Sequence, residues 1–332
     1  MKITIAGSGA MGCRFGAALF DAGHQVTLLD GWRAHVTAIN QAGLRVTDAT
    51  GTRVIAVAAQ GFPDVTAVAD TAQVADLVIV FAKATATAAV AAAANAVGAI
   101  GPSTLVLTLQ NGLGNIEALL AYVPAARLLA GTTTLGTELL GPGRIQALGS
   151  GETILGPLPS GSAPAVTATE AAELIAATLA AAGISVRVVP NALAAIWAKV
   201  AFNCVMNSLC SIGSIPVSAL ARYDGFDALA GSILDEVAAV ARAEGVTVDT
   251  AAVLRLMRAQ FDPSASGDHL ASMLQDLMHG RPTEIAHLNG AIAARAAARG
   301  LPAPVNATVS RLIGLLEATW SSRVNRLRQD PA

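Results

Sequence analysis

The first 190 residues alternate between short apolar runs, typical of buried strands, and longer stretches of helical character. The apolar runs are at residues 2–6, 25–29, 77–82, 104–109, 127–131 and 185–189. The helical stretches are at residues 13–22, 33–41, 84–97, 113–121 and 167–181. Further extended pieces are at residues 44–58, expected to form a strand pair, and at 144–148 and 152–155. This alternation predicts an α/β fold with a doubly wound parallel sheet.

The pattern changes after Pro190, because almost no strand-like run follows. The helical stretches there are at residues 191–212, 216–221, 226–244, 249–260, 270–278, 281–299 and 305–319. The sequence therefore predicts two domains, an α/β domain at residues 1–190 and an all-α domain at residues 191–332. The basic, polar tail at residues 323–332 is expected to fray.

A glycine-rich turn joins the first predicted strand to the first helix. It reads Gly7, Ser8, Gly9, Ala10, Met11 and Gly12. Gly7 permits a tight turn, Gly9 lets the backbone approach a pyrophosphate, and Gly12 lets the helix pack closely on the strand. Asp30, at the end of the second strand, completes the pattern of a dinucleotide-binding, Rossmann-type βαβ unit. The alternative is a glycine-rich turn that binds no ligand.

The composition is 53% hydrophobic and 13% charged, with a formal net charge of −2. So small a charge gives no reason to expect nucleic acid or an anionic membrane as a partner. The N-terminus enters a strand directly and leaves no room for a signal segment, so we expect a soluble, cytoplasmic protein. The cysteines are too few and too scattered for a disulfide framework or a metal cage. They are Cys13, Cys204 and Cys210.

Two groups of polar residues lie where they could act on a ligand. Asn111 follows the strand predicted at residues 104–109, where ligands of open α/β sheets bind, although Asn-Gly sequences also form ordinary turns. Lys199, Asn203 and Asn207 recur every four residues in one predicted helix and form a polar stripe among apolar neighbours. A lysine desolvated in such surroundings has a depressed pKa and can donate a proton near neutral pH. An ordinary solvated helix face is the alternative.

A third group contains an acid and a histidine. Glu284 is expected just inside a helix start, where the helix dipole favours an acid whatever its function. His287 follows three residues later, and a Glu-x-x-His pair can bind a metal ion. Because no further ligands with metal-binding spacing accompany this pair, we expect no metal site.

Together, these residues resemble the ketopantoate reductase (2-dehydropantoate 2-reductase) family over nearly the whole chain. The segments that carry the resemblance are Gly7–Gly12, Lys83, Gln110–Gly112, Gly131–Thr134, Trp197–Lys199, Asn203–Cys204, Ser272–Asp276, Thr283–Ile285 and Asn289–Gly290. The resemblance implies a Rossmann domain joined to a helical domain, with the active site between them. It also implies hydride transfer from NAD(P)H to the ketone of a small 2-oxo acid.

The resemblance implies roles for individual residues. Lys199 would be the general acid that protonates the ketone oxygen as hydride arrives at its carbon. Asn111 would lie near the nicotinamide and help to orient that lysine. Asn203, Asn207 and Ser272 would hold the 2-oxo acid, with Ser272 near its carboxylate.

The resemblance implies that Lys83 and Glu284 contact the cofactor, in addition to the glycine-rich turn. The sequence departs from the family pattern in two features. Many members have a basic residue after the second strand, suited to the 2′-phosphate of NADPH. Here the strand ends in Asp30, so we expect a preference for NADH, partly offset by Arg33. Apolar residues around Val217 replace a polar substrate-contacting position, which leaves room for another 2-oxo acid.

Three functions remain open on these grounds. The first is an NAD(P)H-dependent reductase of ketopantoate or a related branched 2-oxo acid. The second is a dehydrogenase acting on a different 2-hydroxy acid, and the third is a non-catalytic dinucleotide-binding redox sensor. The set Lys199, Asn203 and Glu284 argues against a sensor, which needs no proton donor. A small 2-oxo acid is the expected partner, and the sequence leaves a homodimer open.

Overall fold

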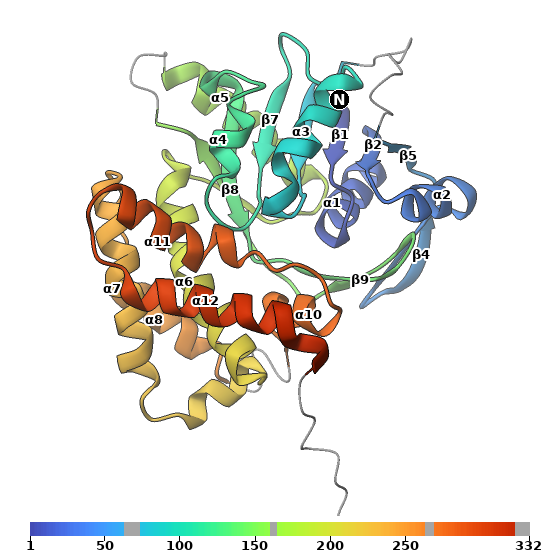
Figure 1. Ribbon diagram of the computed structural model, residues 1–332. Helices are drawn as coiled ribbons and strands as arrows, with labels where there is room; N and C mark the ends of the chain where they lie inside the picture. Colours follow the sequence, from blue (N-terminus) through green and yellow to red (C-terminus); the bar gives the residue numbers. More distant parts are fainter. Residues whose placement is uncertain (63–73, 160–164, 263–268, 323–332) are drawn as a thin grey trace, which may run out of the picture. The chain divides into compact units, whose positions relative to one another are not determined.

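The computed structural model describes residues 1–62, 74–159, 165–262 and 269–322 (Figure 1). The tail expected to fray, residues 323–332, lies outside these residues. The chain divides into two compact units, Met1–Ile196 and Trp197–Ala332.

An eight-stranded sheet forms the centre of the first unit. Its strands, in spatial order, are β12 (Val186–Val188), β11 (Thr153–Pro157), β8 (Leu128–Thr133), β7 (Leu105–Thr108), β6 (Leu77–Val80), β1 (Lys2–Ala6), β2 (Gln25–Asp30) and β5 (Ala58–Gly61). All neighbours are parallel except β8 and β11. The order runs outward in opposite directions from β1, which confirms the doubly wound parallel sheet predicted from the sequence.

Both faces of this sheet are buried, as β6 shows. Leu77 and Ile79 belong to one hydrophobic cluster, whereas Val78 and Val80 belong to another on the opposite face. A strand buried on both faces needs a continuous apolar run rather than an alternating one. The helices of the unit are α1 (Ala10–Asp21), α2 (Arg33–Ala42), α3 (Thr87–Ala96), α4 (Asn115–Leu119) and α5 (Ala165–Ala181).

A second, four-stranded sheet packs beside α1. Its spatial order is β4 (Gly51–Ile55), β3 (Leu44–Asp48), β10 (Arg144–Leu148) and β9 (Gly136–Gly141). The strand pair expected within residues 44–58 is present as β3 and β4. The guanidinium of Arg14 in α1 donates hydrogen bonds to the carbonyls of Gly136 and Leu148, which fixes the β9–β10 hairpin to the helix.

In the second unit the described residues form helices and the loops between them, with no strand among them. Its α-helices are α6 (Ala192–Gly213, which begins in the first unit), α7 (Phe226–Ala243), α8 (Thr250–Ala259), α10 (Ser272–Met278), α11 (Asn289–Ala298) and α12 (Pro304–Thr319). Short 3-10 turns are η3 (Val217–Arg222), η4 (Ile285–His287) and η5 (Trp320–Ser322).

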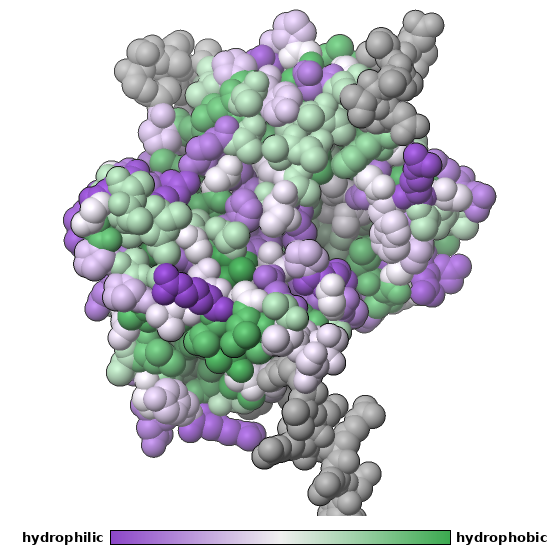
Figure 2. Space-filling model, in the orientation of Figure 1, coloured by the Kyte–Doolittle hydropathy of each residue, from purple (hydrophilic) through white to green (hydrophobic). Residues whose placement is uncertain are grey.

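By length and composition α6 could cross a membrane, but 56% of its apolar window is buried, as in the core helix of a folded domain. Leu312 and Leu315 of α12 are exposed, and Figure 2 shows apolar surface over this helix.

Two predicted helices are wrong in extent. The helix expected at residues 113–121 begins only at Asn115, because Gly112 and Gly114 have φ values of +84° and +97°, outside the helical region. The helix expected at residues 281–299 is interrupted, because the backbone at Leu288 (φ −112°, ψ −110°) separates η4 from α11. Glu284 therefore precedes a 3-10 turn instead of lying inside the start of a long helix.

Candidate active site

The glycine-rich turn lies between β1 and α1, and its glycines have different surroundings. A Cβ atom at Gly7 would lie 2.6 Å from the backbone nitrogen of Ala82, and one at Gly12 would lie 2.1 Å from the carbonyl oxygen of Gly7. These two glycines are required by close packing. A Cβ atom at Gly9 would meet no atom within 4 Å, so this side of the turn is open. Gly9 is also the N-cap of α1, where free N–H groups favour a phosphate.

Asp30 lies at the end of β2 and holds the glycine-rich turn. Its carboxylate accepts hydrogen bonds from the N–H of Ser8 (2.7 Å), the hydroxyl of Ser8 (3.2 Å) and the N–H of Trp32 (2.8 Å). An ionised carboxylate has about four acceptor positions. Three donors from the protein therefore leave about one acceptor position for a ligand, and a second becomes available if the Ser8 hydroxyl turns away. Arg33, the first residue of α2, has an exposed side chain.

A buried polar network braces the loop that follows β7. The side-chain amide of Gln110 donates to the carbonyl of Ala82 (2.7 Å) and to the hydroxyl of Thr87 (2.8 Å). Thr87 donates to the amide oxygen of Asn115 (2.7 Å), whose nitrogen donates to the carbonyl of Asn111 (2.9 Å). The network ties the loop after β6 to the loop after β7. The roles of Thr87 and Asn115 were not predicted from the sequence. These residues follow different strands, and no sequence motif indicates that they meet.

The four predicted cofactor-binding segments of the first unit follow neighbouring strands. The glycine-rich turn follows β1, Asp30 ends β2, Lys83 follows β6, and Asn111 follows β7. Since these strands are parallel and adjacent, their carboxyl ends meet at one edge of the sheet. Asn111 is half-buried and Lys83 is exposed there. The structure thus brings these residues together at the switch point of the sheet, where ligands of this architecture bind.

In the second unit, Lys199, Asn203 and Asn207 lie on one helix, α6, at intervals of four residues. Burial lowers the pKa of the Lys199 ammonium below its ordinary value. That ammonium lies 5.5 Å from the ring centroid of Phe202, a favourable position for a cation. Asn203 is only 5% exposed. The predicted polar stripe is therefore set in apolar surroundings, where a lysine loses its proton more easily than in water.

Ser272 is the first residue of α10, and its hydroxyl accepts a long hydrogen bond of 3.5 Å from the side-chain amide of Asn207. The structure thus joins two of the predicted substrate-binding residues, although they are far apart in sequence. Glu284 is buried in another segment of this unit, just before η4. Val217 is buried at the start of η3, so the apolar character noted in the sequence is present there. In the described parts of the chain, His287 joins no group of three or more metal-ligating side chains.

The chain matches two protein-family models, "Ketopantoate reductase PanE/ApbA" over residues 3–160 and "Ketopantoate reductase PanE/ApbA C terminal" over residues 191–317. The chain belongs to the ketopantoate reductase family. The 2-dehydropantoate 2-reductase of Lactococcus lactis subsp. lactis is 35% identical over 88% of this chain and 90% of its own length. That of Halobacterium salinarum is 33% identical over 96% of this chain and 99% of its own.

Solved structures of similar sequence have the same fold. A PanE/ApbA family ketopantoate reductase from Ralstonia eutropha JMP134 is 34% identical and superposes with a TM-score of 0.82, over 97% of this chain and 100% of its own. D-Mandelate dehydrogenase, solved with NADH and anilino(oxo)acetate, is 30% identical with a TM-score of 0.88 and the same coverage. The fold predicted from the sequence is therefore confirmed.

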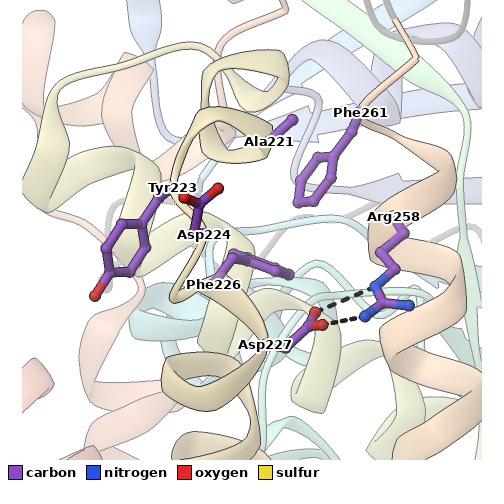
Figure 3. A pocket seen from close by; sticks show the side chains of 7 residues that line it. All are labelled: Ala221, Tyr223, Asp224, Phe226, Asp227, Arg258 and Phe261. Atoms are coloured by element: carbon purple, nitrogen blue, oxygen red, sulfur yellow. Dashed lines mark hydrogen bonds and ion pairs between the residues drawn. The ribbon is translucent and has the colours of Figure 1, made fainter.

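A separate pocket of about 370 Å³ lies in the second unit, between η3, α7 and α8. Its lining residues are Ala221, Tyr223, Asp224, Phe226, Asp227, Arg258 and Phe261. Figure 3 shows Asp227 and Arg258 joined as an ion pair, and the rings of Phe226 and Phe261 pack edge to face at 4.8 Å. No predicted site residue lines this pocket. We interpret its charged pair and its ring contact as packing between α7 and α8.

Proposed function

We propose that this protein is an NAD(P)H-dependent reductase of 2-dehydropantoate or a related branched 2-oxo acid. The observation that carries the proposal is the α6 stripe, in which Lys199 has a lowered pKa and shares one helix face with Asn203. Membership of the ketopantoate reductase family supports the reaction class. A non-catalytic redox sensor accounts poorly for a desolvated lysine, because sensing requires no proton donor.

In this proposal the first unit holds the cofactor. The open side of Gly9 accommodates the pyrophosphate, and the N–H groups at the start of α1 bind it. Asp30 accepts hydrogen bonds from the adenosine ribose, Lys83 contacts the cofactor, and Asn111 lies near the nicotinamide. Glu284, in the second unit, is assigned to the junction of cofactor and substrate by the family resemblance.

The second unit supplies the groups that act on the oxo acid. When bound, the nicotinamide dinucleotide supplies the hydride. Lys199, in its ammonium form, donates its proton to the ketone oxygen as negative charge develops there. The amides of Asn203 and Asn207 hold the acid, and the hydroxyl of Ser272 donates to its carboxylate. A lowered pKa makes Lys199 a better proton donor than an ordinary lysine.

We also propose a preference for NADH over NADPH. Asp30 ends β2, where we expect the adenosine ribose, and its carboxylate would repel the 2′-phosphate of NADPH, since like charges in a partly desolvated site repel strongly. The exposed Arg33 acts in the opposite direction. Comparison of kcat/KM for the two cofactors tests the preference, and Asp30→Ala should narrow the gap. A wild-type enzyme that is faster with NADPH would show that Arg33 dominates the ribose pocket.

A dehydrogenase of a different 2-hydroxy acid is the second candidate. It is favoured by the similarity to D-mandelate dehydrogenase, which was solved with NADH and an oxo acid ligand, and by the buried, apolar Val217. The deciding experiment mixes purified protein with NADH or NADPH and a panel of 2-oxo acids. The panel contains 2-dehydropantoate, other branched 2-oxo acids and the aromatic oxo acid of mandelate. Loss of nicotinamide absorbance identifies the substrate, and no turnover with any acid would favour the sensor.

We further propose that the protein is cytoplasmic and dimeric. Cys13, Cys204 and Cys210 are buried free thiols, as in a reducing compartment. The exposed Leu312 and Leu315 give α12 an apolar surface suited to contact with a second copy. Light scattering measures the mass in solution, and Leu312→Asp should shift a dimer towards the monomer.

A further inference from the structure

A buried chain of hydrogen bonds lies behind the glycine-rich turn. The N–H of Gly143, in the turn between β9 and β10, donates to Nδ1 of His35 (3.0 Å). Nε2 of the same ring lies 3.4 Å from Sγ of Cys13. The thiol of Cys13 donates to the carbonyl of Ser8 (3.0 Å). His35 is 1% exposed, and Cys13 and Ser8 are fully buried.

The hydrogen bonds define the protonation states of His35 and Cys13. Because Nδ1 of His35 accepts a hydrogen bond, the neutral ring carries its proton on Nε2, which faces Cys13 and the Ser8 carbonyl. Burial lowers the pKa of His35, an effect only partly offset by Asp30 and the Ser8 backbone. Burial also raises the pKa of the Cys13 thiol, so it stays protonated and remains a donor. The ring of Trp32 stacks on His35, with centroids 5.3 Å apart.

These donors fix the orientation of one peptide group. The Ser8 carbonyl points inward to Cys13 and His35, and the Ser8–Gly9 peptide is trans. In a planar trans peptide the C=O and N–H bonds point in opposite directions. The N–H of Gly9 therefore points away from the buried pair, on the turn whose Gly9 side is open. A rotation of this peptide would turn the N–H inward and present a carbonyl oxygen to an anion.

We propose that His35 and Cys13 are positioning residues of the dinucleotide-binding turn, holding the Gly9 N–H towards the pyrophosphate. The proposal rests on the proposed function, because it assigns a role at the same site. The β9–β10 hairpin is the fixed support of the pair. Arg14 holds the open end of this hairpin, where Gly136 and Leu148 pair, while Gly143 in the turn at the other end holds His35.

Two amide variants of His35 separate the roles of its two ring nitrogens. In His35→Gln, the amide nitrogen lies near the position of Nε2 and keeps a donor towards Cys13 and Ser8. In His35→Asn, the amide oxygen lies near the position of Nδ1 and keeps the bond from Gly143, but the donor to the turn is lost. Fluorescence titration of the ligand-free protein with NADH measures the dissociation constant. We expect binding weakened about tenfold by His35→Asn and within about twofold of wild type for His35→Gln.

The comparison also distinguishes positioning from general support of the fold. Apparent melting temperatures of the unliganded variants measure support, and kcat at saturating cofactor should be unchanged in both. Equal affinities for the Asn variant and the wild type, or equal losses of affinity in both variants, would overturn the proposal. Cys13→Ala, which removes only the thiol donor, provides a second test, with an expected loss of about threefold that Cys13→Ser restores. If the wild type binds neither NADH nor NADPH, the proposed function itself is wrong.

Discussion

The two units present their functional groups in different ways. In the first, the groups at the ligand-binding edge are mainly backbone N–H groups and strand-end residues, and buried side chains such as Gln110 and His35 hold the loops from behind. In the second, three of the proposed active groups, Lys199, Asn203 and Asn207, are side chains of one helix, and the apolar surroundings of Lys199 lower its pKa. Substitutions that disturb the backbone or the packing should therefore impair the first unit, whereas substitutions that remove reacting side chains should impair the second.

The largest expected effect is on the chemistry of the second unit. Lys199→Ala should lower kcat by a factor of about 100 or more, the usual scale for loss of a general acid. The dissociation constant of NADH should change little, because the glycine-rich turn and Asp30 are intact. Since reduction requires the ammonium form, wild-type kcat should also fall at alkaline pH, with a midpoint below the ordinary lysine pKa. Steady-state kinetics and cofactor titration measure these quantities.

Lys2→Ala is a matched control, because Lys2 is an exposed residue of β1. It should leave both kcat and cofactor affinity near the wild-type values. Near-wild-type turnover of Lys199→Ala would remove this lysine from the mechanism and with it the contrast between the two units.

The same substitution at two glycines should have different effects in the first unit. Gly12→Ala places a Cβ atom 2.1 Å from the Gly7 carbonyl, so we expect a free energy of unfolding lower by about 3 kcal/mol. Gly9→Ala meets no protein atom within 4 Å, and Gly9 has φ −63°, which alanine tolerates. Its fold should be unchanged, while its methyl group enters the proposed pyrophosphate site and weakens NADH binding about tenfold or more.

Chemical denaturation and fluorescence titration of both variants measure the two effects. Unchanged NADH affinity in a folded Gly9→Ala protein would show that the open side of the turn does not receive the cofactor. A stable Gly12→Ala protein would show that helix α1 can shift away from the turn.

The first unit could be predicted from the sequence further than the second. The glycine spacing, the continuous apolar strands and Asp30 indicate the sheet and its ligand-binding edge, because each reflects a local backbone requirement. The bracing by Thr87, Asn115 and His35 could not be predicted, since their partners come from separate crossovers. Such contacts depend on which strands lie next to each other in the sheet, and the local hydrophobic pattern does not reveal this order.

In the second unit, helical periodicity predicted the stripe of Lys199, Asn203 and Asn207, which the structure confirms on α6. The contact between Asn207 and Ser272 depends on helix packing and was not predictable from spacing. The break before Asn289 was also missed. The 3-10 turn ends at an unusual backbone conformation of Leu288, and the sequence there contains no proline or other obvious helix breaker. The roles of Ser272 and Glu284 came from family resemblance alone.

A smaller effect is expected on the Michaelis constants, where substitutions in the second unit should affect the oxo acid more than the cofactor. Asn203→Ala and Ser272→Ala each remove a proposed hydrogen bond to the oxo acid, so KM for the acid should rise about tenfold. KM for the nicotinamide cofactor should stay within about twofold, because neither Asn203 nor Ser272 is among the proposed cofactor contacts. Ser232→Ala, at an exposed position of α7, is the matched control for Ser272. A rise in cofactor KM alone would reverse the proposed division of the site.

The smallest expected effect is the acid sensitivity that His35 gives to the first unit. Burial lowers the pKa of His35 in the folded state, so the unfolded chain binds the proton first as the pH falls through about 6.5. The free energy of unfolding should be highest above that pH and decrease below it, by at most about 1.4 kcal/mol per pH unit for one group. His24, whose pKa is also lowered by burial and by the nearby N-terminus, acts in the same direction. His35→Gln should therefore reduce the slope between pH 7 and pH 5 without abolishing it, as urea denaturation at each pH would show. An unchanged slope would mean that His35 takes up its proton at no cost to the fold, and the buried support behind the glycine-rich turn would then be less rigid than its hydrogen bonds indicate.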